Sequence, residues 1–228
     1  MFLFSKQSDA KLDGLRYEVK IPMEAVQLSQ FHHHLYELGL YPMRPFPPRK
    51  VSSVYYDTRN FDDYTDNVSG IANRTKIRIR WYNDDLTKLT LEFKIKKNKA
   101  SFKESLKIAN LQLYDPATRD GVRLILRGLN KTTEHNILLQ REPIIQVEYD
   151  REYFLLNEEL RMTIDVNQKF KKLYPFQSHT FMNSPVTCVA EFKYPASKRL
   201  IMQSMLRNLP FRVFRHSKYV IGNDLVAS

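Results

Sequence analysis

Four segments of this chain alternate strictly between an apolar side chain and a charged one: residues 17–21, 75–81, 91–96 and 190–194. Successive side chains on a β-strand point to opposite faces, so each segment predicts a strand with one apolar side and one ionic side. In the clearest case Lys76, Arg78 and Arg80 share one side, and Ile77 and Ile79 lie on the other. The chain is therefore expected to form a sheet that is apolar on one face and ionic on the other.

The ionic face has two interpretations. A merely solvated face would mix Thr, Ser and Gln among the charges, whereas here it is mainly Arg, Lys and Glu. A face so rich in cations suits a bound polyanion. The pattern alone favours the two interpretations equally, and both stay open at this point.

Composition narrows the classes of function. The chain has 228 residues, 43% of them hydrophobic, which is enough for a buried core. Its net charge of +11 points to an anionic partner such as phosphate compounds, nucleic acid or an acidic membrane surface. The single cysteine, Cys188, lies in an apolar stretch and predicts a buried thiol rather than a nucleophile. No apolar run approaches the roughly 20 residues of a membrane span, so we expect a cytoplasmic protein, which a membrane-protein partner would hold at the inner face of a membrane.

The expected elements mix strands with fewer helices. Strands are predicted at residues 16–21, 50–57, 75–82, 88–96, 101–108, 144–155, 160–165 and 187–194. Helices are predicted at 22–39, where Pro22 suits a first turn, at 115–129 and at 195–209. Residues 60–73 form a polar, helix-compatible segment, and the tail 217–222 predicts a closing strand or a loop. This order indicates an α+β fold, and a closed barrel would place every ionic face around one cavity.

Other familiar sites are disfavoured by the sequence. The run from His32 to His34 looks like a metal site, but consecutive residues on a helix point about 100° apart and do not converge on one ion. Neither a Walker-type phosphate loop nor a dinucleotide-binding glycine fingerprint occurs. A basic run could touch RNA or lipid, although solvated strand ends explain it better. It consists of Arg74, Lys76, Lys96, Lys97 and Lys99.

Short motifs along the chain carry a resemblance to a known family. They are Tyr17-Glu18-Val19-Lys20, Val54-Tyr55-Tyr56-Asp57-Thr58, Lys76-Ile77-Arg78-Ile79-Arg80-Trp81-Tyr82, Leu91-Glu92-Phe93-Lys94, Val147-Glu148-Tyr149-Asp150-Arg151, Arg161-Met162-Thr163-Ile164-Asp165, Glu191-Phe192-Lys193 and Ser217-Lys218-Tyr219. In this order they resemble the VTC domain, the catalytic domain of vacuolar transporter chaperone-type polyphosphate polymerases, among the triphosphate tunnel metalloenzymes related to CYTH proteins. The likeness runs from about Arg16 to Asp224, and we expect a single domain over residues 1–228.

The resemblance implies a closed antiparallel tunnel of about eight strands with flanking helices. It implies transfer of the ATP γ-phosphate to a growing polyphosphate chain with Mn²⁺ or Mg²⁺. The implied catalytic cations are Lys20, Arg78, Arg80, Lys94, Arg151 and Arg161. The implied substrate-binding residues are Lys96, Lys103, Lys193 and Lys218. Glu191 is the implied metal ligand, with Glu18 as a second ligand or an ion-pair partner, and Glu92 is expected to pair with neighbouring cations.

The sequence departs from the pattern of the wider group at one motif, which leaves other functions open. The Glu-x-Glu-x-Lys motif of the wider CYTH group is incomplete, because the segment from Arg16 to Lys20 keeps only the second glutamate, Glu18. The alternatives are a tunnel triphosphatase and a non-catalytic subunit that binds polyphosphate or inositol pyrophosphate. The expected partners are ATP, polyphosphate and a membrane-protein subunit, with no specific nucleic acid. Lysine and arginine are expected to stay charged through neutral pH, so activity should depend on metal and ionic strength.

Overall fold

The computed structural model describes residues 4–8, 16–97, 100–109, 115–128, 133–157, 159–175, 178 and 180–227. Its ten strands form one antiparallel sheet in the order β1-β6-β5-β4-β3-β7-β8-β10-β2, with β9 paired to β8. The strands are β1 (Phe4–Ser8), β2 (Arg16–Met23), β3 (Arg49–Asp57), β4 (Arg74–Tyr82), β5 (Lys88–Lys97), β6 (Ala100–Ala109), β7 (Glu142–Leu155), β8 (Arg161–Lys172), β9 (Met182–Asn183) and β10 (Cys188–Pro195).

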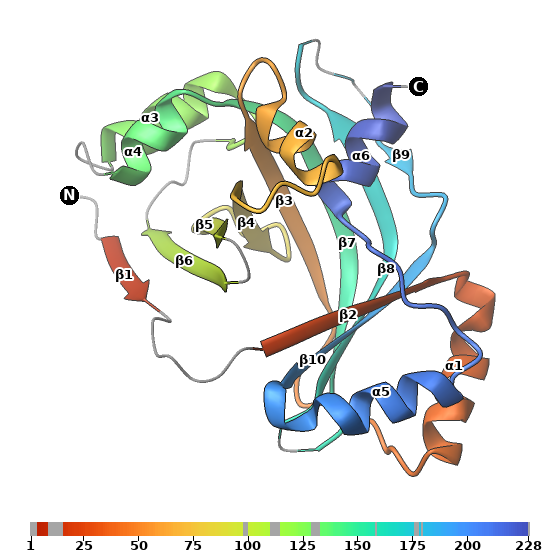
Figure 1. Cartoon of the computed structure of the whole chain (residues 1–228). Coiled ribbons are helices and arrows are strands. Elements are labelled where there is room, and N and C mark those ends of the chain that lie inside the picture. The colour runs from red at the N-terminus through yellow and green to blue at the C-terminus, as the bar shows by residue number, and fades with distance from the viewer. Residues whose placement is uncertain are drawn as a thin grey trace.

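Six α-helices accompany the sheet in the described part of the chain. They are α1 (Leu28–Glu37), α2 (Asp62–Val68), α3 (Arg119–Gly128), α4 (Thr133–Leu139), α5 (Arg199–Asn208) and α6 (Lys218–Ala227). Figure 1 shows β4, β5 and β6 on one side, β2 and β10 on the other, and the long strands β3, β7 and β8 between them. The sheet therefore bends around a central space, and its two faces differ.

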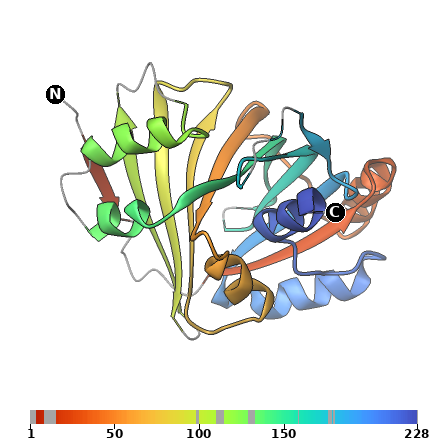
Figure 2. The same cartoon turned by 90° about the horizontal axis from the view of Figure 1, so that it is seen from above.

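The outer face of the sheet carries two apolar cores. The first packs β4 and β5 against α3 and α4, through residues such as Ile77, Phe93 and Ile125. The second packs β2, β8 and β10 against α1 and α5, through residues such as Phe192 and Met202. Figure 2 shows these helix pairs at opposite ends of the bent sheet. Because alternate residues of each strand are buried here, the charged residues between them are directed to the inner face.

One end of the inner face is filled by a third apolar core. Tyr219 of α6 stacks on Tyr55 of β3 with ring centroids 5.3 Å apart, and its hydroxyl donates to Asp57. Phe170 and Val147 complete the same cluster. Helix α6 therefore plugs one end of the central space.

The expectation of a closed barrel is wrong. Within the described residues, β1 and β2 are the two edges of the sheet and are not hydrogen-bonded to each other. The α+β class and the antiparallel pairing are confirmed. Alternation predicts which side chains share a face, but the bend and closure of a sheet depend on strand tilt and stagger that the pattern does not carry.

Several element boundaries also differ from the prediction. Pro22 continues β2 opposite Val189, and the helical residues begin only at Ala25. A proline is tolerated there because β2 is an edge strand. Strand β8 extends to Lys172, and β1 was not predicted. The predicted helix at 115–129 begins at Arg119.

The tail differs most, because residues 218–227 form helix α6 instead of a closing strand or loop. Lys218, Tyr219, Gly222 and Asn223 are its buried residues, which is one face of a helix. The β-branched Val220 and Ile221 suggested a strand, and the packing of α6 against β7 and β8 overrides that preference.

Gly222 lets α6 approach the sheet closely. A Cβ at this position would lie 2.5 Å from Phe170 Cδ1 and 2.6 Å from Ile145 Cδ1. Alanine is the better helix former by about 1 kcal/mol, so an exposed glycine would gain stability from this change. We expect Gly222→Ala instead to lower the free energy of unfolding by about 1–3 kcal/mol in a denaturant titration, because the core is overpacked. An unchanged or higher stability would show that α6 is not held this tightly.

Candidate active site on the inner face

The inner face gathers the predicted charged residues into three groups, each built on carboxylates. In the first group Glu92 of β5 lies among cations from β4 and β6. Arg78 Nε donates to Glu92 at 2.5 Å, Lys103 Nζ lies 3.0 Å away and Arg80 3.7 Å away. The Glu92 side chain is 7% exposed, and these cations hold its pKa well below the usual range despite burial. The predicted ion-pairing role of Glu92 is confirmed.

The second group joins β2, β10 and β5. Lys20 Nζ lies 3.0 Å from Glu18 and 3.5 Å from Glu191. Lys193 Nζ lies 2.7 Å from Glu191, and Lys94 Nζ lies 3.7 Å from Glu18. Strands β5 and β2 are not neighbours in the sheet, so the Lys94–Glu18 pair spans the central space. Burial opposes ionisation of Glu191, but Lys193, Lys20 and Arg151 lower its pKa well below the usual range, so it is a carboxylate.

The third group is built on Asp165 of β8, whose side chain is fully buried. Arg151 of β7 donates to both carboxylate oxygens, at 2.6 and 2.8 Å, and Lys218 of α6 donates at 2.6 Å. Lys218 Nζ also lies 4.5 Å from the centre of the Tyr149 ring. Asp165 therefore fixes two cations that come from different elements, β7 and α6.

The segment before α6 completes the inner face. Phe214 N donates to Lys20 O at 3.0 Å, so this segment lies along the free edge of β2. Lys20 Nζ donates to the carbonyl of His216 at 3.0 Å. Burial and the cations Lys218 and Lys20 lower the pKa of His216 to about 3, so its imidazole stays neutral. Its Nε2 lies 3.1 Å from Gln168 Oε1, which fixes the ring.

Lys76 is an inner-face residue whose importance the sequence did not reveal. Its Nζ donates to Ser217 Oγ at 3.0 Å, joining β4 to the segment before α6. Burial lowers the pKa of Lys76 to about 7, and Lys94, Lys20, Arg74 and Arg78 add to the effect. The expectation that every lysine stays charged through neutral pH is therefore wrong for Lys76.

This lysine gives anion binding a pH dependence. A bound phosphate raises the pKa of Lys76, so binding takes up a proton above about pH 7. We expect the affinity for tripolyphosphate to be full below pH 7 and to fall as pH rises above it, by up to about tenfold per unit. Calorimetric titration between pH 6 and 9 measures this slope. Lys76→Gln should flatten it, and an identical slope in that variant would refute the assignment.

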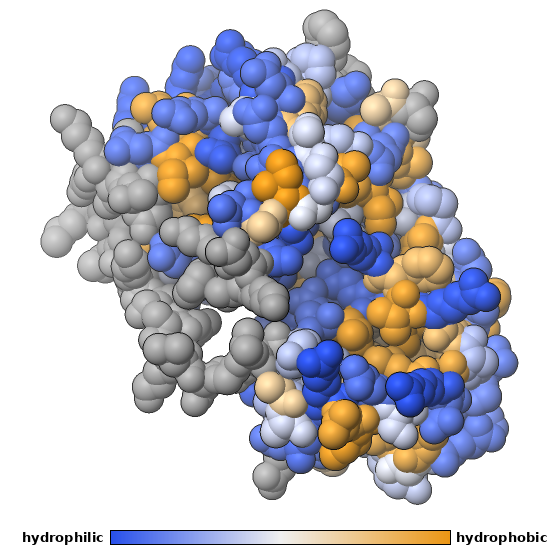
Figure 3. Space-filling model, viewed as in Figure 1, coloured by the Kyte–Doolittle hydropathy of each residue, from blue (hydrophilic) through white to orange (hydrophobic). Residues whose placement is uncertain are grey.

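Two predicted site residues lie at the ends of the inner face instead of in its groups. Arg161 is exposed at the start of β8, opposite Leu155 in the register with β7. Lys96 pairs in register with Arg74 and lines a hollow of about 300 Å³ beside α2. The other ten predicted residues lie in the three groups. Figure 3 shows hydrophilic side chains in the recess at the middle of the molecule.

The carboxylates of the second group are the best candidates for holding a divalent cation. Among the described residues, no three His, Cys, Asp or Glu side chains gather closely enough to hold a metal by themselves. Burial and the charge of Glu191 oppose ionisation of Glu18, but Lys20, Lys94 and Lys193 lower its pKa below the usual value. Lys20 contacts both carboxylates, so the two lie on either side of one ammonium group. Mg²⁺ and Mn²⁺ accept one or two carboxylates when substrate phosphates supply the remaining oxygens. Glu18 and Glu191 fit such a site.

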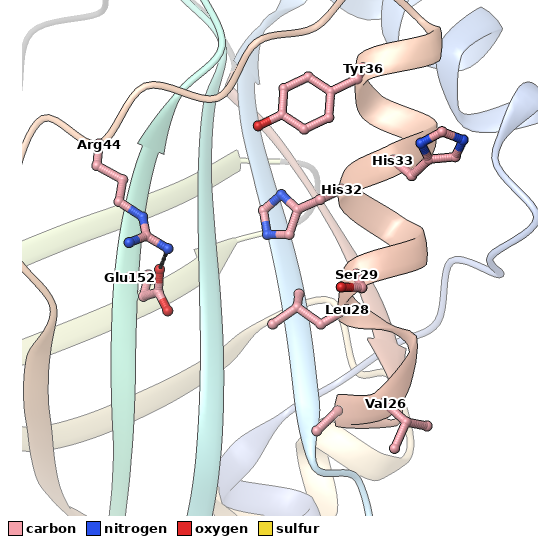
Figure 4. Close-up of a pocket in the computed structure, with 9 residues that line it drawn as sticks. Val26, Leu28, Ser29, His32, His33, Tyr36, Arg44 and Glu152 are labelled. Carbon is pink, nitrogen blue, oxygen red and sulfur yellow. Dashed lines mark ion pairs between the residues drawn. The ribbon is translucent and has the colours of Figure 1, made fainter.

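Among the described residues, a separate groove lies outside this face, between α1 and β7. It measures about 590 Å³ and is lined by residues that include His32, His33, Arg44 and Glu152. Figure 4 shows His32 directed towards the Arg44–Glu152 ion pair while His33 points away from it. His32 and His33 therefore point in different directions, in line with helical geometry.

The sequence missed three further inner-face residues that touch the cations. Tyr55 accepts from Arg78 at 3.0 Å, Tyr149 accepts from Arg80 at 3.5 Å, and Asp165 has the contacts given above. Asp165 and Tyr149 belong to the motifs that resemble the VTC domain, but the resemblance assigned neither of them a role. Only strand parity could have placed them on the ionic face, since Asp165 shares it with Arg161.

Comparison with known proteins agrees with this geometry. The family model of the VTC domain matches residues 15–227. The chain belongs to the VTC-domain family. No curated protein matches this VTC domain significantly.

Solved structures share the fold of this VTC domain at low sequence identity. A protein of Pyrococcus horikoshii is 15% identical, with a TM-score of 0.52, covering 94% of this chain and all of its own. A proposed adenylate cyclase of Vibrio parahaemolyticus is 14% identical, with a TM-score of 0.53 and coverage of 91% and 97%. A proposed adenylyl cyclase of Hippeastrum, described as having a dominant triphosphatase activity, is 13% identical, with a TM-score of 0.50 and coverage of 92% and 94%. These likenesses show the fold alone.

The fold of the VTC domain therefore brings the charged strands together on one face. None of its helices, in the part of the chain that the structure describes, has the length and apolar character needed to cross a bilayer.

Proposed function

We propose that this VTC domain is a polyphosphate polymerase that transfers the γ-phosphate of ATP to a growing polyphosphate chain and releases ADP. One observation carries the proposal. The three groups and Lys76 bring nine cationic side chains together with only four carboxylates. Such an excess of positive charge in a partly buried space suits a substrate with many phosphates.

The residue types fit phosphoryl transfer between two phosphate chains. Arg78, Arg80 and Arg151 present planar donors that match phosphate oxygens, and the lysines supply movable charges. In the reaction the bond from the γ-phosphorus to the β–γ bridging oxygen breaks, and a bond to a terminal oxygen of the polymer forms. That oxygen is ionised at neutral pH, so no side chain has to remove a proton. The inner face therefore acts by aligning both chains and offsetting their charge.

Carboxylates are needed in this arrangement for two reasons. Glu92 and Asp165 hold Arg78, Arg80, Lys103, Arg151 and Lys218 in fixed positions. Glu18 and Glu191 would hold Mn²⁺ or Mg²⁺, which supplies further positive charge for the phosphate oxygens. Lys20 already lies between Glu18 and Glu191, so its ammonium group orients both carboxylates.

A tunnel triphosphatase is the second candidate. The fold likeness to the Hippeastrum protein described as having triphosphatase activity favours it. In that reaction water replaces the polymer end as acceptor. Among the described residues of the three groups, no neutral histidine faces the cations except His216, which is held by Gln168 and has a pKa of about 3. Water would need a base such as Lys76, whose pKa is about 7, whereas the ionised end of a polyphosphate chain needs none, so the polymerase is preferred.

The products of the purified chain decide between these functions. The protein is incubated with ATP and Mn²⁺ or Mg²⁺, the products are separated on a gel stained for polyphosphate, and ADP is assayed in parallel. Polymer with a matching amount of ADP is the expected result. Free orthophosphate alone would assign the triphosphatase. Binding of polyphosphate without turnover would assign the non-catalytic subunit.

A further inference from the structure

An aromatic cluster surrounds Arg49 at the end of the inner face opposite to α6. The Arg49 guanidinium carbon lies 5.8 Å from the centre of the Phe46 ring, 5.9 Å from Tyr82 and 5.8 Å from Tyr153. The Phe46 and Tyr153 rings meet edge to face at 6.1 Å. These four residues come from the proline-rich loop and from β3, β4 and β7. We call them the aromatic mouth.

The aromatic mouth continues directly from the arginines of the inner face. Tyr82 follows Arg80 by two residues on β4, and Tyr153 follows Arg151 by two on β7. Residues two apart on a strand share a face and are separated by about 7 Å. Arg49 is the register partner of Arg151. A triphosphate held by Arg80 and Arg151 would therefore have the aromatic mouth one step along the strands.

The rings of the aromatic mouth are accessible to a ligand, and their contacts with Arg49 are long. Phe46 is 53% exposed, and Tyr82 and Tyr153 are half-buried. The distances from Arg49 to the rings are close to the limit of about 6 Å for a cation–π contact. Among the described residues, no carboxylate lies within ion-pair distance of Arg49. The cluster thus presents partly exposed rings and an uncompensated cation at the end of the inner face opposite to α6.

We propose that the aromatic mouth binds the nucleoside of ATP, with the base stacked on its rings and Arg49 close to the α-phosphate. This inference rests on the proposed function and adds to it the position and direction of the nucleotide. The opposite end is filled by Tyr219, Tyr55 and Phe170, so it offers no comparable binding site for a base. The γ-phosphate then points inward, towards the three groups.

This arrangement predicts how the site distinguishes its ligands. Stacking of a base on aromatic side chains strengthens binding and accepts every base, because each base has a π-face. The aromatic mouth should therefore favour nucleoside triphosphates over inorganic tripolyphosphate, with little preference among bases. The polymer end, which has no base, gains nothing from these rings.

The test compares two ligands on the same variants. The uncleaved β,γ-imido analogue of ATP and inorganic tripolyphosphate are each used, with Mg²⁺ present, to displace a fluorescently labelled short polyphosphate. Phe46→Ala removes an exposed ring of a loop, and Tyr153→Leu removes a second ring while keeping apolar bulk. Tyr41→Ala is the matched control, since Tyr41 is 66% exposed in the same loop and its ring meets Tyr36 of α1 instead.

We expect Phe46→Ala and Tyr153→Leu each to weaken binding of the ATP analogue about tenfold and to leave binding of tripolyphosphate unchanged. The control variant Tyr41→Ala should bind both ligands as the unaltered protein does. An equal loss for both ligands, or no loss for either, would overturn the inference while the proposed function stands. If neither ligand displaces the labelled polyphosphate from the unaltered protein, the proposed function fails and the inference fails with it.

Discussion

Replacing Arg80 by alanine is expected to lower kcat/KM for ATP by about a thousandfold, the size of effect seen when one charge-stabilising donor is removed from a phosphoryl-transfer or oxyanion site. Among the arginines of the three groups, Arg80 has the donors that are least committed to the protein. Its nearest contacts are long, at 3.5 Å to Tyr149 and 3.7 Å to Glu92. Within the described residues its buried Nε has no hydrogen-bond partner. A phosphate oxygen would satisfy it.

The same variant should leave the fold intact, because Glu92 keeps Arg78 and Lys103. Steady-state kinetics and a thermal melt measure the two effects separately. Lys88→Ala is the matched control, since it removes the same charge from an 84% exposed position whose ion pair is with Asp85. Activity near the wild-type level in Arg80→Ala would remove the inner face from the mechanism.

The second large effect is on stability, at Asp165. Asp165→Asn removes the negative charge that Arg151 and Lys218 share and leaves two buried cations uncompensated. Breaking a buried ion pair in this way costs about 3–5 kcal/mol. We expect a loss of that size in a urea titration, together with loss of polyphosphate binding. Asp85→Asn, at a surface ion pair, should leave stability nearly unchanged.

Acid should reproduce this effect in the unaltered protein. Burial favours the neutral acid, but Lys218 and Arg151 lower the pKa of Asp165 to about 2, below the ordinary value of 3.8. The carboxylate thus adds about 2 kcal/mol to stability above roughly pH 4, and this is lost as pH falls towards 2. Denaturant titrations at pH 5 and pH 3 measure the loss. An Asp165→Asn variant with the same acid dependence would place the effect elsewhere.

Alternation of apolar and charged residues predicted the strands and the composition of the inner face. Ile77 and Ile79 lie in an apolar core, and Arg78 and Arg80 lie opposite them, as the pattern requires. The pattern works because strand geometry fixes side-chain direction locally. It could not predict that Lys94 reaches Glu18, since this contact depends on the bend of the whole sheet.

Two other features depend on distant parts of the chain. The lowered pKa of Lys76 comes from burial beside Lys94 and Lys20, which no local pattern carries. The helical form of residues 218–227 depends on docking against β7 and β8. The roles of the individual site residues, the single-domain organisation and the metal remain predictions.

The contact between Lys20 and the carbonyl of His216 joins residues that are 196 positions apart. Ribosomes add about 5–20 residues each second, so roughly 10–40 s pass between the synthesis of these two residues. During that interval β2 exists without the segment that lies along its free edge. Most cations of the inner face are therefore synthesised before the segment that positions them. The polypeptide becomes able to bind phosphate only when helix α6 has been made.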